Sequence, residues 1–140
     1  MSAKFALDPR LGGDSVPVID LPLCSVRLMD DARFAWLLLV PRRGATSEIH
    51  ELDGIDQESL WREIRLASDA LRAVAPCDKL NLGALGNIVR QLHVHVVARR
   101  EGDAAWPGPV WGSGVAEPYA APVREHLVAA LRDRLAAKAG

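Results

Sequence analysis

Residues 91–97 carry the side chains of this sequence that are best suited to chemistry. They read Gln-Leu-His-Val-His-Val-Val, so polar residues alternate with aliphatic ones. Successive side chains of a β-strand point to opposite faces. A strand over 91–98 would therefore place Gln91, His93 and His95 on one face. The aliphatic residues between them would lie on the other face, where they can be buried against a core.

Three interpretations of this stretch are open. It can be a half-exposed edge strand whose polar residues face water. It can be a metal site, because histidines two residues apart on a strand can bind one ion, but no Cys or carboxylate stands nearby at a helpful spacing for a third ligand. It can also be a catalytic site, in which a neutral imidazole nitrogen attacks phosphorus and a neighbouring imidazole handles protons.

The stretch resembles the signature of the histidine triad (HIT) superfamily, His-Φ-His-Φ-His-Φ-Φ, where Φ is apolar. It matches at every position but the first, where Gln91 stands in place of a His. Residues 81–89 resemble the Asn- and Gly-rich phosphate-contacting loop of the family, slightly shortened. Residues 37–42, an apolar run followed by Pro and Arg, resemble another of its segments. Together these matches span much of residues 23–98.

The resemblance implies a nucleotidyl hydrolase or transferase that acts on nucleoside phosphate derivatives, such as dinucleoside polyphosphates (diadenosine tetraphosphate, for example) or phosphoramidates. In such proteins the middle His attacks the α-phosphorus and forms a nucleotidyl-histidine intermediate, which water then cleaves. His93 holds that position here. His95 would hydrogen-bond the phosphate or the leaving oxygen, and Gln91 completes the expected catalytic set. The nucleotide-binding residues that the resemblance implies are Asn81, Asn87, Val89 and Asp30.

Some of these roles have alternatives. Asn87 can equally be an ordinary turn residue, and Asp31 competes with Asp30 for the place of the acid that holds the ribose hydroxyls. Gln91 cannot carry a proton, and Trp36 stands where some relatives have an additional His. The polar network behind the nucleophile is therefore expected to be thinner. Two other functions stay open: a nucleotide-binding protein with little or no turnover, and a metal-binding module.

Length and composition predict one globular domain over 1–140. Lys and Arg total 17 and Asp and Glu 18, and no basic stripe suggests a nucleic-acid partner. No signal peptide or apolar run of membrane-spanning length is evident, and the two cysteines form no Cys-x-x-Cys pair. We expect a cytoplasmic protein that needs no metal or other cofactor and has no membrane partner. The resemblance implies a homodimer.

The hydrophobic pattern predicts an α+β fold: an antiparallel sheet with a helix between its strands and a C-terminal helix. Strands are expected at 24–28, 34–40, 79–82 and 91–98, and helices from Asp56 to about Ala75 and from about Pro122. The last two strands are too close in sequence for a helical crossover, so they should pair antiparallel. Trp106 and Trp111 follow in a Gly- and Pro-rich segment, where they can stack on a base, cover a dimer contact or pin the loop to the core.

Overall fold

The computed structural model describes residues 4–139 of the chain. They form a five-stranded sheet in the order β1-β2-β3-β5-β4, in which all neighbouring strands are antiparallel. The elements are α1 (Pro9–Asp14), β1 (Ser15–Asp20), β2 (Cys24–Met29), β3 (Ala35–Pro41), the 3-10 turn η1 (Ile49–Glu51), α2 (Gly54–Val74), β4 (Lys79–Gly83), β5 (Val94–Arg99) and α3 (Ala121–Ala139). The predicted α+β class and the antiparallel pairing of β4 with β5 are confirmed.

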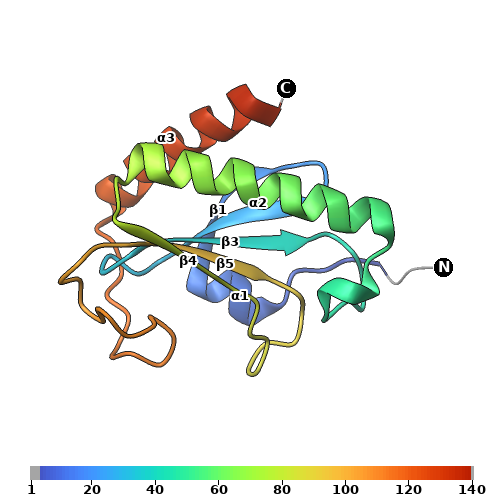
Figure 1. Cartoon of the computed structure of the whole chain (residues 1–140), viewed down its shortest axis with the longest axis horizontal. Helices are drawn as coiled ribbons and strands as arrows, with labels where there is room; N and C mark the ends of the chain where they lie inside the picture. The colour runs from blue at the N-terminus through green and yellow to red at the C-terminus, as the bar shows by residue number, and fades with distance from the viewer. Residues whose placement is uncertain (1–3, 140) are drawn as a thin grey trace.

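The two faces of the sheet carry different layers. Figure 1 shows α2 and α3 on one face, whereas α1 and the long segment between β5 and α3 lie on the other. β3 lies at the centre of the sheet and is buried from Trp36 to Pro41. Its nearly continuous apolar run is explained by this position, because both of its faces are covered. No helix within residues 4–139 is long and apolar enough to cross a membrane.

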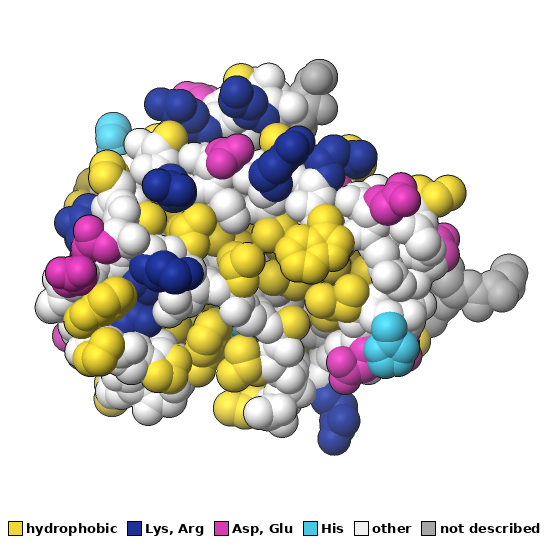
Figure 2. All heavy atoms as spheres, in the orientation of Figure 1, with side chains coloured by type: hydrophobic (Ala, Val, Ile, Leu, Met, Phe, Trp, Pro, Cys, Tyr) yellow, Lys and Arg dark blue, Asp and Glu magenta, His cyan; other side chains and the backbone are white. Residues whose placement is uncertain are grey.

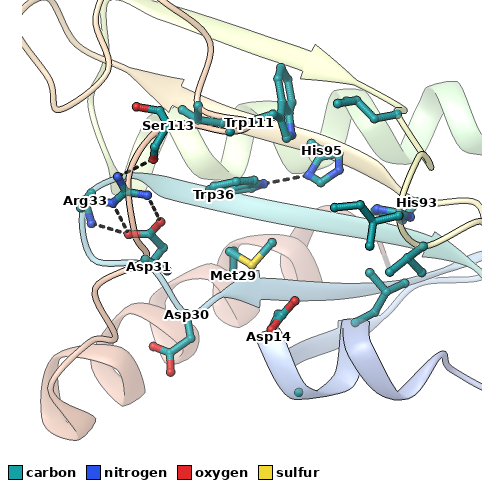
Figure 3. Close-up of a pocket in the computed structure, with 18 of the residues that line it drawn as sticks. Asp14, Met29, Asp30, Asp31, Arg33, Trp36, His93, His95, Trp111 and Ser113 are labelled. Carbon is teal, nitrogen blue, oxygen red and sulfur yellow. Dashed lines mark hydrogen bonds and ion pairs between the residues drawn. The ribbon is translucent and has the colours of Figure 1, made fainter.

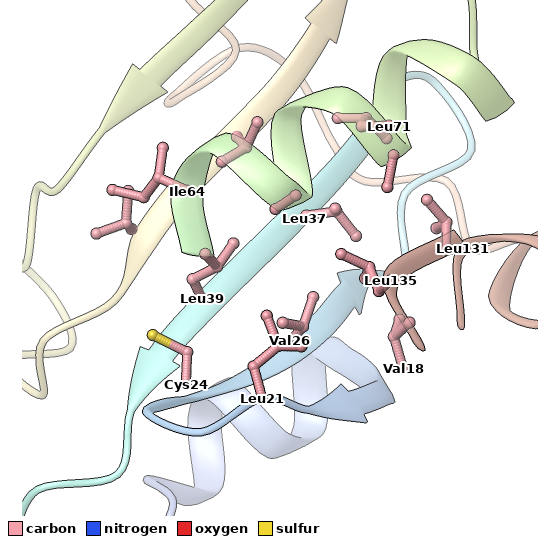
Figure 4. Packing of buried hydrophobic residues seen from close by; sticks show 14 of the residues in the cluster. Val18, Leu21, Cys24, Val26, Leu37, Leu39, Ile64, Leu71, Leu131 and Leu135 are labelled. Atoms are coloured by element: carbon pink, nitrogen blue, oxygen red, sulfur yellow. The ribbon is translucent and has the colours of Figure 1, made fainter. Parts of the chain in front are cut away.

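The main hydrophobic core fills the space between the sheet and the two long helices (Figure 4). Leu37 and Leu39 of β3 enter it from the sheet, and α2 supplies the apolar face that its sequence predicts. The helix residues of that face are Leu60, Ile64, Ala67 and Leu71. Leu92, Val94 and Val96 are buried in the same core. The aliphatic half of the 91–97 pattern therefore anchors this stretch, as the alternation predicts.

Two boundaries differ from the sequence-based expectation. α2 begins at Gly54 because Asp53 caps it and accepts a hydrogen bond from the N–H of Asp56 at 2.8 Å. The Asp56 carboxylate instead pairs with Arg43 at 2.6 Å. β5 begins at Val94 rather than at residue 91, because the preceding backbone leaves the sheet, and the N–H of Leu92 bonds the carbonyl of Thr46 at 2.9 Å.

The first 20 residues contain two elements that the sequence pattern does not predict. α1 is a short helix that starts at Pro9 and is capped by the Asp8 side chain, an arrangement that an Asp-Pro pair favours. β1 is an edge strand whose pairing with β2 is irregular between Pro17 and Ile19. Proline is tolerated at such positions of an edge strand. α1 matters for the site because Leu11 and the residues after it form one wall of a cavity.

A buried carboxylate ties α2 to the sheet. Glu63 is fully buried and accepts hydrogen bonds from the backbone N–H groups of Leu23 at 2.9 Å and Cys24 at 2.7 Å. These bonds hold the turn between β1 and β2 against the helix. Hydrogen bonds to a charged group are stronger than neutral ones, and an unsatisfied buried N–H is costly.

We predict that Glu63→Ala lowers the free energy of unfolding by about 3 kcal/mol, because two buried N–H groups lose their acceptor. Urea denaturation followed by circular dichroism measures this change. Glu58→Ala is the matched control, since Glu58 is exposed on the same helix, and its effect should stay within about 0.5 kcal/mol. Equal effects of the two substitutions would contradict this role for Glu63.

Candidate active site

A cavity of about 680 Å³ opens on the face of the sheet opposite α2 and α3 (Figure 3). Met29, Trp36 and His95 come from β2, β3 and β5 and form its floor. Its walls are α1, the 85–89 loop and the 110–118 segment. The cavity therefore draws on segments that are far apart in the sequence.

His93 and His95 lie together in this cavity. Their ring centroids are 4.8 Å apart, and both residues are only 6% exposed. They share one side of the chain, although His93 lies just before the first residue of β5. The neighbouring Leu92 and Val94 are buried in the main core, so both imidazoles are held from behind.

The backbone fixes which nitrogen of His93 carries a hydrogen. Its Nδ1 lies 2.7 Å from the carbonyl oxygen of Gln91. Because a carbonyl oxygen can only accept a hydrogen bond, Nδ1 of neutral His93 must be the donor. Nε2 is then left with a free lone pair. This is the protonation state that a nucleophilic imidazole needs.

His95 has the opposite arrangement. The indole Nε1 of Trp36 donates a hydrogen bond to its Nδ1 at 3.0 Å. Since an indole N–H can only donate, Nδ1 of His95 is the acceptor, and Nε2 carries the hydrogen of the neutral ring. Burial, reinforced by the charge of His93, lowers the pKa of His95 to about 3. His95 is therefore a neutral ring over the whole physiological range.

The Gln91 side chain does not share the cavity with His93 and His95, although the alternation predicts that all three lie on one face. Its side-chain Oε1 accepts a hydrogen bond from the N–H of Asp8 and its Nε2 donates one to the carbonyl of Ala6, both at 2.8 Å. The amide thus ties down the N-terminal segment, while the backbone carbonyl of the same residue holds His93. The Gln91 side chain does not line the cavity.

The predicted nucleotide-binding residues fall into two groups. Asn87, Val89 and Asp30 line the cavity together with the histidines. Asn81 does not, because its Oδ1 accepts a hydrogen bond from Arg99 at 2.8 Å on the side of the sheet near the 103–108 loop. The 85–89 loop that carries Asn87 turns at Gly86, whose φ of +69° favours glycine.

The two aspartates at the end of β2 differ in their surroundings. Asp30 accepts hydrogen bonds from the N–H of Tyr119 at 3.0 Å and from Arg124 at 3.1 Å, so it joins the cavity to the start of α3. Asp31 is buried and pairs with Arg33 at 2.8 Å. Burial opposes ionisation of Asp31, but hydrogen bonds from Arg33 and the N–H of Glu117 outweigh it and lower its pKa. Asp31 therefore fastens the 110–118 segment to the β2–β3 turn.

The two tryptophans of the Gly- and Pro-rich segment have different positions. Trp111 lines the cavity and meets His95 edge-on, with ring centroids 5.3 Å apart. A Cβ on Gly83 would lie only 2.9 Å from the Trp111 ring, so glycine is what allows this approach. Trp106 instead packs against the guanidinium of buried Arg99, at 5.5 Å. Trp106 thus pins the loop to the sheet, as one of the sequence-based alternatives proposes.

Several cavity residues were not expected from the sequence. Among them are Leu11, Asp14, Arg33 and Ser113. Asp14 follows a Gly-Gly pair in a stretch with no recognisable pattern, and Ser113 belongs to an irregular loop, so neither had a local signal. Within residues 4–139, no group of three or more His, Cys, Asp or Glu side chains is arranged to hold a metal ion.

Comparison with known proteins agrees with this fold. The HIT domain family model matches residues 12–102. A histidine triad protein from Bradyrhizobium japonicum is 47% identical, covers 95% of this chain and 99% of its own, and has a TM-score of 0.93. The corresponding values for a histidine triad protein from Sinorhizobium meliloti are 49%, 93%, 96% and 0.91. Those for one from Marinobacter aquaeolei are 38%, 99%, 100% and 0.94.

Among curated proteins, none matches the chain significantly. The family model covers well over half of the sequence, and the solved structures from these three bacteria match almost all of it. The chain therefore belongs to the histidine triad (HIT) family.

The low pKa of His95 predicts a pH dependence of stability. The unfolded chain binds a proton on this ring below about pH 6.5, whereas the folded protein does so only near pH 3. The stabilisation is therefore complete above about pH 6.5. It falls by about 1.4 kcal/mol per pH unit as the pH drops towards 3.

Urea denaturation of wild type and His95→Gln between about pH 7.5 and pH 4 tests this dependence. The wild-type free energy of unfolding should decrease more steeply with falling pH than that of the variant, which has no imidazole at this position. Parallel curves would show that His95 takes up a proton equally well in the folded and unfolded protein.

Proposed function

We propose that this protein is a nucleotidyl hydrolase or transferase that acts on nucleoside phosphate derivatives through a nucleotidyl-histidine intermediate. The observation that carries the proposal is the pairing of two oppositely arranged imidazoles. His93 offers a lone pair on Nε2, and His95 offers a hydrogen on Nε2, in the same cavity. One nitrogen suits attack on phosphorus, and the other suits stabilisation of negative charge on oxygen.

In the first step the Nε2 lone pair of His93 forms a bond to the α-phosphorus, and the bond from phosphorus to the leaving group breaks. The electron pair of that bond departs with the leaving group, which takes a proton from solvent. His95 donates a hydrogen bond to the phosphoryl or leaving oxygen. In the second step water attacks phosphorus, the bond from phosphorus to Nε2 breaks, and its electron pair returns to His93. The water proton goes to solvent.

The remaining cavity residues suit the other parts of a nucleotide. Asn87 and the backbone of its loop can donate hydrogen bonds to phosphate oxygens. Asp30 is a hydrogen-bond acceptor that suits ribose hydroxyls. The apolar side chains of Leu11, Met29 and Val110 can pack against a base. Dinucleoside polyphosphates and phosphoramidates both present an α-phosphorus of the required kind.

Gln91 takes the place of the first histidine of the triad in this proposal. Its backbone carbonyl orients His93, which any residue at that position could do. Its amide cannot relay a proton, and it is already engaged with the N-terminal segment. This engagement favours the second candidate function, a nucleotide-binding protein with little turnover.

The free thiols of Cys24 and Cys77 fit the reducing cytoplasm expected from the sequence.

His93→Ala should lower turnover by several orders of magnitude, because no other group in the cavity offers an imidazole lone pair with the same orientation. His95→Ala should cause a smaller loss, since water can partly replace a hydrogen-bond donor. Diadenosine tetraphosphate and adenosine phosphoramidate serve as substrates, each assayed with and without chelator. Turnover is expected to survive chelation.

Labelled substrate and a quench that avoids acid should trap nucleotide on the wild-type protein and none on folded His93→Ala. Label that maps to His95, or near-normal turnover of His93→Ala, would contradict the mechanism. Tight binding of nucleoside monophosphates without turnover by the wild type would support the second candidate function instead.

We propose further that the protein is a homodimer that pairs through α2 and the edge strand β4. Figure 2 shows hydrophobic side chains gathered on the face that holds these two elements. Trp61 on α2 is 61% exposed and Leu82 on β4 is 49% exposed. β4 pairs with a strand on one side only, and an uncovered edge with apolar neighbours favours pairing with another chain.

Light scattering at micromolar concentration should give the mass of a dimer for the wild type and a smaller apparent mass for Trp61→Glu. Ile55→Glu is the control, because Ile55 is an equally apolar, 75% exposed residue at the first turn of α2. A monomeric wild-type protein, or the same mass shift in both variants, would count against pairing through this face.

A further inference from the structure

Trp36 on β3 and His95 on β5 are joined across the cavity floor by a hydrogen bond between an indole and an imidazole. Trp36 pairs with Val97 in the register of β3 and β5, and His95 pairs with Leu38. The indole and the imidazole are thus diagonal neighbours on one face, within reach of each other. The 3.0 Å hydrogen bond from Nε1 to Nδ1 is shielded from water, since both residues are less than a tenth exposed.

The indole of Trp36 is held in place by other rings. Phe34 meets it edge-on with ring centroids 6.3 Å apart, and Trp111 does so at 6.5 Å. Edge-to-face packing of this kind is favourable and restricts rotation of the ring. Figure 3 shows Trp36 lying along the cavity floor with its N–H directed at His95. The direction of the donor is therefore set by the fold.

We propose that Trp36 is a positioning residue that holds His95 as the neutral ring with its hydrogen on Nε2, so that a fixed hydrogen-bond donor stands beside His93. The inference rests on the proposed function for its catalytic consequence, but not for the hydrogen bond itself. Trp36 stands where some relatives have an additional His, and the sequence alone predicts a thinner polar network at this point. The indole supplies a polar contact to His95 at this place.

The contact also determines how His95 can act. A proton on Nδ1 would bring two N–H groups face to face, so the hydrogen bond from Trp36 disfavours the imidazolium form. The other aromatic neighbour, Trp111, carries no charge, and His93 is the titratable group whose charge acts on His95. A neutral imidazole that gave up its Nε2 hydrogen would become an imidazolate. His95 thus stabilises charge by donating a hydrogen bond, and the leaving group obtains its proton from solvent.

The hydrogen bond can be tested in the wild-type protein without any substrate. In protein labelled with 15N, long-range 1H–15N spectra at about pH 7.5 should show a protonated Nε2 and an unprotonated Nδ1 for His95. A 15N–15N coupling across the hydrogen bond should connect Nδ1 of His95 with Nε1 of Trp36. A hydrogen on Nδ1 of His95, or a resolved pair of signals with no such coupling, would overturn the proposal.

Two matched substitutions then separate the effect of the hydrogen bond from the effect of a smaller aromatic ring. Trp36→Phe keeps an aromatic ring and removes the donor, so the pKa of His95 should rise by about one unit, a tenfold change in proton affinity. Trp111→Phe makes the same change in the same cavity, at an indole N–H that has no hydrogen-bond partner among the described residues. It should leave the coupling between Trp36 and His95 in place.

Turnover of Trp36→Phe should fall by about tenfold or more, and the NMR titration of His95 in the folded variant should move to higher pH. An unchanged His95 pKa in folded Trp36→Phe would overturn the proposal. If Trp36→Phe does not fold, the wild-type coupling still decides the question. If the wild type has no turnover but the coupling is present, the proposed function fails while the positioning of His95 by Trp36 stands.

Discussion

The site depends on one constraint: the two sides of β5 and of the residues before it face different environments, a hydrophobic core and a cavity. One side of this segment is aliphatic and is buried under α2, with Leu92, Val94 and Val96 in the main core. The opposite side carries the imidazoles of His93 and His95. A shift of the pairing register by one residue would bury the imidazoles under the helix and expose the aliphatic side chains. Burial of the aliphatic side therefore holds the histidines in the cavity.

The position of the hydrogen on each imidazole follows from hydrogen bonds that each ring can make in only one way. A backbone carbonyl accepts from His93, and an indole donates to His95. Two identical side chains, 4.8 Å apart, are thereby given opposite arrangements of hydrogen and lone pair. Neither arrangement requires a charged partner. The contact to His93 comes from the backbone carbonyl of residue 91, so Gln91 in place of a histidine leaves this part of the site intact.

The sequence predicts the parts of this structure that depend on local periodicity. The apolar face of α2, the strand preceding Pro41 and the antiparallel pairing of β4 with β5 all follow from spacing and length. The positions of His93 and His95 on one side follow from the same alternation. Asn87, Val89 and Asp30 were expected from the family resemblance and not from periodicity, and all three line the cavity.

The other features depend on contacts between distant segments. The bond from Trp36 to His95 requires the register of β3 against β5, which no local pattern encodes. Gln91 turns towards the N-terminal segment because Ala6 and Asp8 lie beside it. Asn81 is drawn away by Arg99, whose own position depends on the 103–108 loop. In each case a polar side chain finds its partner tens of residues away along the chain or in an irregular loop.

The most direct test of the account is a crystal structure with a bound nucleoside monophosphate. We expect the α-phosphorus to lie about 3–3.5 Å from Nε2 of His93, with one phosphoryl oxygen accepting a hydrogen bond from Nε2 of His95 and the ribose near Asp30. A nucleotide bound in the cavity with its phosphate away from His93, or bound on another surface, would contradict it.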